Sequence, residues 1–317
     1  MNLETIFCGV KFKNPLVLAS GVLGVTGASL RNVVKTGGAG GVTTKSIWRQ
    51  GHLGHPNPVI IANDHFMLNA VGLPDAGIEK AYIEIGEYMK NKPAPLIANI
   101  VESRIEDFAE VAALVDALHP DIIEVNISCP NVEDEFGKPF SCSRVDAAAV
   151  TAAVRRRTKI PITIKLSPNV MNIAEIAKAV VDAGADGITA INTVGPGMLI
   201  DLETREPILA NKVGGVSGPA IKPIAIKAVY DIHKAVPKTP IIGTGGVLTG
   251  EDALEMIMAG ATLVGVGTAV YYRDIICFKL IAEEMKKWGK AHGIKDLGKI
   301  RGTAHDSGYS DKFKGYN

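Results

Sequence analysis

Eight short apolar segments recur along the chain, separated by longer segments with helical periodicity. The apolar segments are rich in Val, Ile, Leu and Ala and span residues 15–20, 41–47, 95–100, 121–128, 161–166, 186–193, 240–246 and 263–268. Between them, apolar side chains recur every three or four residues, which predicts amphipathic helices over 104–118, 145–158, 172–184 and 250–260. Because strands that alternate with helices pair in parallel and are covered on both faces, this order predicts a parallel α/β fold.

The polar residues of these segments lie at or near their C-terminal ends: Ser20, Lys45, Asn99, Asn126, Lys165, Asn192, Thr193, Thr244 and Thr268. In a (β/α)₈ TIM barrel those ends converge on one mouth, which holds the active site. A doubly wound open sheet also gathers ligand residues there, but no GxGxxG follows the first strand. Eight strands in 317 residues therefore favour one TIM-barrel domain spanning residues 1–317.

Three connections are longer than a barrel usually needs. Residues 51–75, rich in Pro and Asn, follow the second strand, residues 132–144 follow the fourth, and residues 195–223 follow the sixth. Long connections inside a compact domain are usually functional. We therefore expect three long loops at the mouth of the barrel.

Composition excludes several classes of protein. Hydrophobic residues make up 47% and charged residues 21%, which suits a large core. The formal net charge is +1 and the longest basic cluster is Arg155 to Arg157, so no nucleic-acid partner is indicated. Neither a signal peptide nor the ~20 apolar residues of a membrane span is present, so a cytoplasmic location is expected. The four cysteines form no CxxC pair, so no metal site or iron–sulfur cluster is indicated.

Two glycine-rich turns follow the seventh and eighth strands, GTGG at 243–246 and GVGT at 265–268. Glycine lets the backbone approach a phosphate closely, and this part of a barrel commonly binds one. Either turn alone could be a tight turn without a ligand. The pair, joined by SGPAIKP at 217–223, indicates a phosphate on a cofactor or substrate.

Two lysines, five asparagines and one cysteine lie at these strand ends or in the nearby loops. A buried lysine is costly without a partner, so Lys45 and Lys165 favour an electron-rich ligand such as a reduced flavin. Amide side chains suit a planar heterocycle, and the candidates are Asn69, Asn99, Asn126, Asn131 and Asn192. Cys129 directly follows the fourth strand and could be a general base. Most cysteines are core filler, which remains our interpretation of Cys8 and Cys277.

Taken together, the motifs LASG, TTKS, NAVGLP, NISCPN, IKLSPN, IIGTGGV and GVGTAVY resemble dihydroorotate dehydrogenases of class 1, most closely the catalytic subunits of class 1B. The resemblance runs from FKNPLVLASG to GTAVYYRD. It implies an FMN-containing barrel that oxidises (S)-dihydroorotate to orotate in pyrimidine (UMP) biosynthesis. Cys129 would remove the carbon-5 proton, hydride from carbon 6 would pass to FMN, and Lys45 would contact both flavin and substrate.

The resemblance also implies the binding residues and partners. The substrate set is Lys45, Asn69, Val71, Gly72, Leu73, Asn126, Asn131, Asn192 and Thr193. The FMN set is Ala19, Ser20, Gly21, Lys45, Ser46, Asn99, Asn126, Lys165, Ile191, Gly218, Gly245, Gly246, Gly267 and Thr268. A second subunit with FAD and a [2Fe-2S] cluster would pass electrons to NAD, in a heterotetramer, and the chain could also be a homodimer.

Several alternatives remain open at this point. A dihydropyrimidine dehydrogenase-like flavoenzyme shares the SCP loop, although NAVGLP and SCPN favour dihydroorotate. Fumarate could replace NAD as the acceptor. A non-redox barrel synthase could use the glycine turns for a substrate phosphate, and a catalytically dead scaffold would not oxidise dihydroorotate. The acidic stretch VEDEFGKPFSCSRVDA departs from relatives and brings in Cys142 as an outside candidate for the base.

Overall fold

A closed barrel of eight parallel strands forms the centre of the computed structural model, which describes residues 1–128 and 139–306. In chain order the strands are β3 (Leu16–Leu18), β4 (Gly41–Thr43), β7 (Leu96–Ile100), β8 (Ile122–Asn126), β9 (Ile162–Leu166), β10 (Gly187–Ala190), β13 (Ile241–Thr244) and β14 (Leu263–Val266). Each lies within one of the eight predicted segments, and β14 pairs with β3 to close the ring. The predicted TIM barrel is confirmed.

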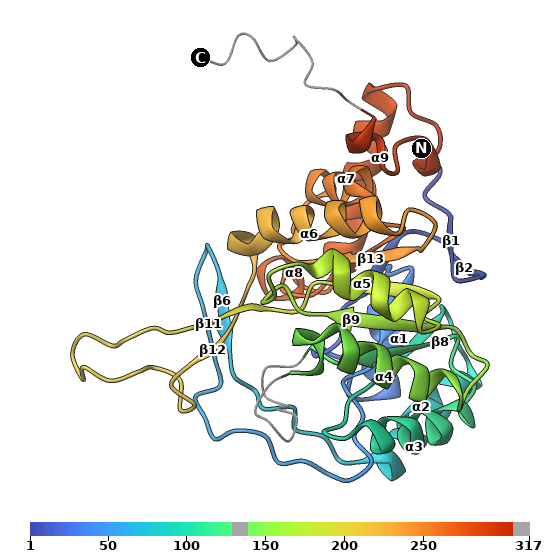
Figure 1. Cartoon of the computed structure of the whole chain (residues 1–317). Coiled ribbons are helices and arrows are strands. Elements are labelled where there is room, and N and C mark those ends of the chain that lie inside the picture. The colour runs from blue at the N-terminus through green and yellow to red at the C-terminus, as the bar shows by residue number, and fades with distance from the viewer. Residues whose placement is uncertain (129–138, 307–317) are drawn as a thin grey trace.

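Helices surround the barrel in the alternating order that the periodicity predicts (Figure 1). They are α1 (Gly27–Lys35), α2 (Ile78–Lys90), α3 (Ile105–Asp116), α4 (Arg144–Arg155), α5 (Ile173–Asp182), α6 (Lys222–Ala235), α7 (Gly250–Ala259), α8 (Ala269–Arg273) and α9 (Cys277–Ala291). Short 3₁₀ turns are η1 (Phe140–Cys142), η2 (Pro219–Ile221), η3 (Leu297–Lys299) and η4 (Thr303–His305). No helix within 1–128 and 139–306 is long and apolar enough to cross a bilayer.

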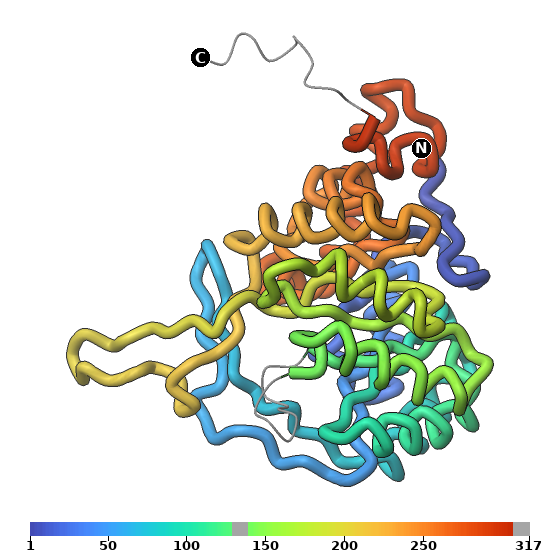
Figure 2. Tube along the Cα trace, in the orientation of Figure 1, coloured from blue at the N-terminus to red at the C-terminus, as the bar shows by residue number. Residues whose placement is uncertain are grey.

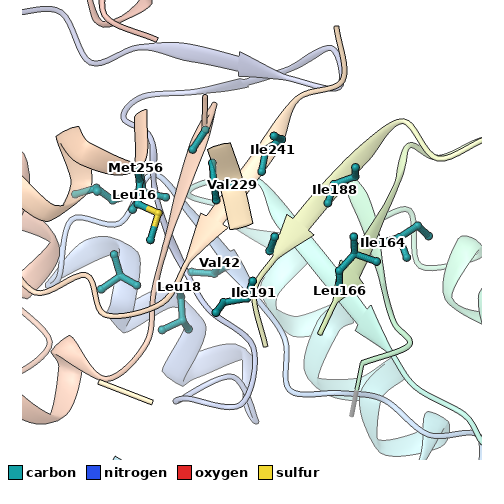
Figure 3. Packing of buried hydrophobic residues seen from close by; sticks show 14 of the residues in the cluster. Leu16, Leu18, Val42, Ile164, Leu166, Ile188, Ile191, Val229, Ile241 and Met256 are labelled. Atoms are coloured by element: carbon teal, nitrogen blue, oxygen red, sulfur yellow. The ribbon is translucent and has the colours of Figure 1, made fainter. Parts of the chain in front are cut away.

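Two apolar layers hold the barrel together. Outside it, strand side chains such as Leu16 and Ile241 pack with Val229 of α6 and Met256 of α7 (Figure 3). Inside, the N-terminal halves of the strands are filled by a second cluster that includes Phe7 and Phe12. These two rings come from the hairpin of β1 (Thr5–Phe7) and β2 (Val10–Phe12). The hairpin therefore plugs the end of the barrel opposite its mouth.

The loops after the second and sixth barrel strands contain strands that the sequence did not predict. β5 (Ile60–Ala62) and β6 (Met67–Asn69) come from the first loop, and β11 (Val194–Gly197) and β12 (Gly214–Ser217) from the region of the second. They form one antiparallel sheet in the order β11-β12-β6-β5, because β12 pairs with β6. Figure 2 shows this sheet and its long connections on the opposite side of the molecule from the β1–β2 hairpin. What we expected to be two separate loops is thus one sheet.

Candidate active site

A cavity of about 240 Å³ lies at the C-terminal ends of the barrel strands, with the antiparallel sheet as one wall. Most of the residues expected to bind FMN line it: Ala19, Ser20, Gly21, Lys45, Ser46, Asn126, Lys165, Ile191, Gly218, Gly245, Gly246, Gly267 and Thr268. It is also lined by most of the expected substrate residues, namely Asn69, Val71, Gly72, Leu73, Asn192 and Thr193. Cys129 and Asn131 lie outside the described residues. The structure thus gathers the described candidates, with the exception of Asn99, around one cavity.

Asn99 does not line this cavity, because it is fully buried inside the barrel. Its Nδ2 donates to Glu124 Oε1 at 2.5 Å, and the hydroxyl of Thr189 donates to the other carboxylate oxygen at 2.7 Å. Among the described residues, none donates a hydrogen bond to Asn99 Oδ1. Sequence reasoning missed Glu124, although an acidic residue within an otherwise apolar strand was the available signal.

Hydrogen bonds between side chains fix the residue at which β8 leaves the barrel. The hydroxyl of Ser128 donates to Asn126 Oδ1 at 3.0 Å, and Asn192 Nδ2 donates to the same hydroxyl at 3.0 Å. Asn126 Nδ2 donates in turn to the hydroxyl of Ser46 at 3.4 Å. Residues from three barrel strands or their ends therefore hold Ser128 in place, one residue before Cys129.

Both lysines reach the cavity without a carboxylate partner. Neither the Lys45 nor the Lys165 ammonium forms an ion pair with any residue in the described part of the chain, although Lys165 is 8% exposed. Burial lowers the pKa of Lys45, and the charge of Asp75 partly opposes that shift. Two cations held without anionic partners in this way suit an electron-rich ligand.

The glycine turns have backbone conformations that side chains disfavour. Gly218, Gly245 and Gly246 have φ angles of +86°, +132° and +73°. A Cβ on Gly246 would lie 2.7 Å from Lys222 N, and one on Gly245 would lie 2.7 Å from Ala225 Cβ. At Gly267 an added Cβ would meet nothing closer than 3.6 Å. Gly245 and Gly246 are thus packed against α6 and Gly218 against Phe66 and Met67, while Gly267 leaves space beside the cavity.

The antiparallel sheet supplies cavity residues that the sequence did not reveal. Asn69 Nδ2 donates to Gly215 O at 3.3 Å, which joins β6 to β12 beside the cavity. Gly215 also abuts Thr193, whose Oγ1 would lie 2.1 Å from an added Cβ. The lining residues outside the expected substrate and FMN sets are Val22, Ile60, Met67, Gly215, Ser217, Ile221, Thr244, Val247 and Gly265. Those on the sheet could be found only by knowing that the two long loops pair.

The other cysteines lie away from the cavity. Cys142 is exposed in η1. Cys277 is buried at the start of α9, where burial raises the pKa of its thiol to about 11. Burial and the charge of Asp186 raise the pKa of Cys8 to about 12. None of the three lines the cavity.

Comparisons with known proteins agree on one family. Residues 2–288 match the family model described as "Dihydroorotate dehydrogenase". A protein of Methanocaldococcus jannaschii named "Dihydroorotate dehydrogenase B (NAD(+)), catalytic subunit" is 45% identical over 308 residues, which cover 96% of this chain and 98% of the relative. A protein of Methanosarcina mazei with the same name is 46% identical over 94% of each chain.

A solved structure shows the same fold. It is the crystal structure of DHODH from Eimeria tenella in complex with ferulenol, with a TM-score of 0.83. The match covers 96% of this chain and 89% of that one, at 23% identity. At this identity the likeness supports the barrel architecture.

Proposed function

This chain belongs to the dihydroorotate dehydrogenase family, and from that premise we propose that it oxidises (S)-dihydroorotate to orotate with FMN as its bound cofactor. The observation that carries the proposal is the composition of the cavity at the mouth of the barrel. Two ammonium groups, three asparagine amides and the glycine turns after β13 and β14 all line it. Lysines and amides suit a planar, electron-rich heterocycle, and glycine turns suit a phosphate.

One feature of the described residues fits FMN. The turn at Gly267 leaves room beside Ala19 that a side chain would fill. Glycine turns at the ends of the last two strands are also where barrels of this type commonly bind phosphate.

The chemistry divides between a base and a hydride acceptor. We assign removal of the carbon-5 proton to the Sγ of Cys129, because NISCPN places that residue directly after the anchored Ser128. When bound, FMN accepts the hydride from carbon 6. Loss of that proton and hydride gives the carbon–carbon double bond of orotate.

Other residues of the cavity orient the substrate. The amides of Asn69 and Asn192 each present donors and an acceptor to a pyrimidine ring, and Lys45 offers a cation to its carboxylate or to a carbonyl. Asn192 is held by Ser128, and Asn69 by Gly215. Because these side chains are fixed before a substrate arrives, little conformational freedom is lost on binding.

We further propose that electrons leave through a second subunit that carries FAD and a [2Fe-2S] cluster, with NAD as the final acceptor. The names of the two relatives support this, since both read "catalytic subunit" and "NAD(+)". The chain has no cysteine spacing that suits such a cluster. The isolated chain should therefore reduce NAD⁺ slowly in a stopped-flow assay with dihydroorotate, and rapid reduction without a partner would contradict this part of the proposal.

Anaerobic titration tests the activity itself. The purified chain should show the absorption of oxidised flavin, and dihydroorotate should bleach it. Cys129→Ala should keep FMN but lose the bleaching, whereas the matched control Cys142→Ala should bleach as the natural chain does. Purified protein that binds no added FMN would refute the cofactor assignment, and full-rate bleaching in Cys129→Ala would refute the assignment of Cys129 as the base.

A further inference from the structure

We propose that Lys222 and Asp252 are positioning residues whose ion pair fixes the distance between the Gly218 turn and the Gly245–Gly246 turn, and thereby sets the affinity for the FMN phosphate. The inference rests on the proposed FMN site. It assigns a role to two residues that do not line the cavity.

The pair joins the first turns of two neighbouring helices. Lys222 is the first residue of α6 and follows Gly218 across the short turn η2. Asp252 lies in the first turn of α7, which follows Gly245 and Gly246. Lys222 Nζ lies 2.7 Å from Asp252 Oδ1, and the two side chains are 29% and 12% exposed. The contact is therefore short and partly shielded from water, unlike a typical surface ion pair.

Asp252 holds its own turn with its second oxygen. Oδ2 accepts the backbone N–H of Leu248 at 2.9 Å and that of Thr249 at 2.8 Å, and the Thr249 hydroxyl completes a capping box. Burial raises the pKa of the Asp252 carboxyl, but the hydrogen bonds from Lys222 and these amides outweigh burial and leave the pKa lowered. One carboxylate therefore ties the start of α7 to the start of α6.

The two turns are already in close contact at this point. An added Cβ on Gly246 would lie 2.6 Å from Lys222 Cβ and 2.7 Å from Lys222 N. Amide–phosphate hydrogen bonds tolerate only a few tenths of an ångström around ~2.9 Å. The ion pair thus holds together two turns whose amides can bind one phosphate only at a fixed spacing.

Direct attraction of the phosphate by Lys222 does not explain the arrangement. Its ammonium also lies 3.3 Å from Glu255, so one cation faces two carboxylates and the group has a formal net charge of −1. A net negative group repels a phosphate. The pair therefore acts through geometry, and neutralising Asp252 distinguishes the two explanations.

Flavin binding to the full-length chain, freed of FMN and titrated by fluorescence quenching, tests the inference. Riboflavin serves as the second probe because it lacks the phosphate. In Asp252→Asn the single amide oxygen would still accept the backbone N–H groups of Leu248 and Thr249. The side-chain NH₂ group would then face the Lys222 ammonium, so the ion pair is lost. We expect Lys222→Met and Asp252→Asn each to weaken FMN binding about tenfold, with riboflavin binding unchanged within about twofold.

Two controls make the result specific. Lys227→Met breaks the exposed Lys227–Asp231 pair on the same helix and should leave both affinities unchanged. The double variant should bind FMN no worse than the weaker single variant, because both remove one interaction. If Lys222→Met does not fold, the FMN affinity of Asp252→Asn tests the inference, because this variant keeps the hydrogen bonds that cap α7.

Three results would overturn the inference. Tighter FMN binding in Asp252→Asn would mean that the carboxylate acts by charge, and an equal loss of riboflavin would mean that the pair supports the fold in general. Unchanged FMN binding in both variants would remove any role for it. Failure of the natural chain to bind FMN at all would instead refute the proposed function.

Discussion

Gly246→Ala should lower the stability of the protein, and its retention of FMN, more than the backbone conformation of Gly246 alone explains. Gly246 has φ +73°, a region that costs an alanine about 1–2 kcal/mol. The new methyl group would also lie 2.6 Å from Lys222 Cβ and 2.8 Å from Lys222 Cα. Because backbone cannot rotate aside as a flexible side chain can, overpacking should add about 1–3 kcal/mol. The expected loss of unfolding free energy is therefore about 2–5 kcal/mol in total.

Gly293 provides a matched control. Its φ is +68°, and an added Cβ would meet nothing within 4 Å. Gly293→Ala should therefore lose only the conformational share, about 1–2 kcal/mol. In a chain of this size each kcal/mol lowers Tm by roughly 2 °C, so calorimetry should separate the two variants by several degrees.

Flavin content completes the assay. Moving Lys222 away from Gly246 widens the spacing of the two turns, so Gly246→Ala should also retain less FMN after gel filtration, while Gly293→Ala should retain it fully. Equal Tm values and equal flavin content in the two variants would refute the reasoning, because the contact with Lys222 would then have no consequence.

Two other predictions follow from the pKa shifts. Lys45→Met should lose FMN, yet its flavin-free form should be more stable at pH 7 by thermal unfolding. Burial lowers the pKa of Lys45 more than the charge of Asp75 raises it, so folding disfavours the charged ammonium. The stability gained by Lys45→Met should therefore shrink as the pH rises through this lowered pKa. A lower Tm for Lys45→Met than for the natural chain at pH 7 would contradict this. In iodoacetamide labelling at pH 8 read by mass spectrometry, exposed Cys142 should react well before Cys8 and Cys277, because burial raises the pKa of their thiols to about 12 and about 11. Early labelling of Cys8 or Cys277 would count against those shifts.

The barrel could be predicted because its signal is local. Each of the eight strands is a run of buried apolar residues with a helical segment after it, as β9 and α5 illustrate. The antiparallel sheet could not be predicted in the same way. β11 reads VGPG and β12 reads GGVS, and the Gly and Pro in them have low strand propensity. They form strands by pairing, β11 with β12 and β12 with the distant β6.

The residues of the candidate site were predictable where the signal was local and unpredictable where it depended on pairing between loops. Lys45, Asn126 and Lys165 were predictable, since a polar residue at the end of an apolar strand stands out. Gly215 and Met67 were not, because they reach the cavity only through the pairing of two loops. Asn99 does not line the cavity, because on β7 it pairs with Glu124, two residues before the cavity-lining Asn126 of β8, and its place in the FMN set stays a prediction.

The pairing of β6 with β12 also has a consequence during synthesis on the ribosome. The hydroxyl of Ser217 donates to Met67 O, and the two residues are 150 positions apart. Until the later strand has emerged, β6 has only β5 beside it and its other edge carries unpaired backbone groups. Four of the eight barrel strands, β7 to β10, emerge in that interval, so one wall of the cavity is completed late. A nascent chain that stalls in that interval would expose an open strand edge to mispairing with other chains.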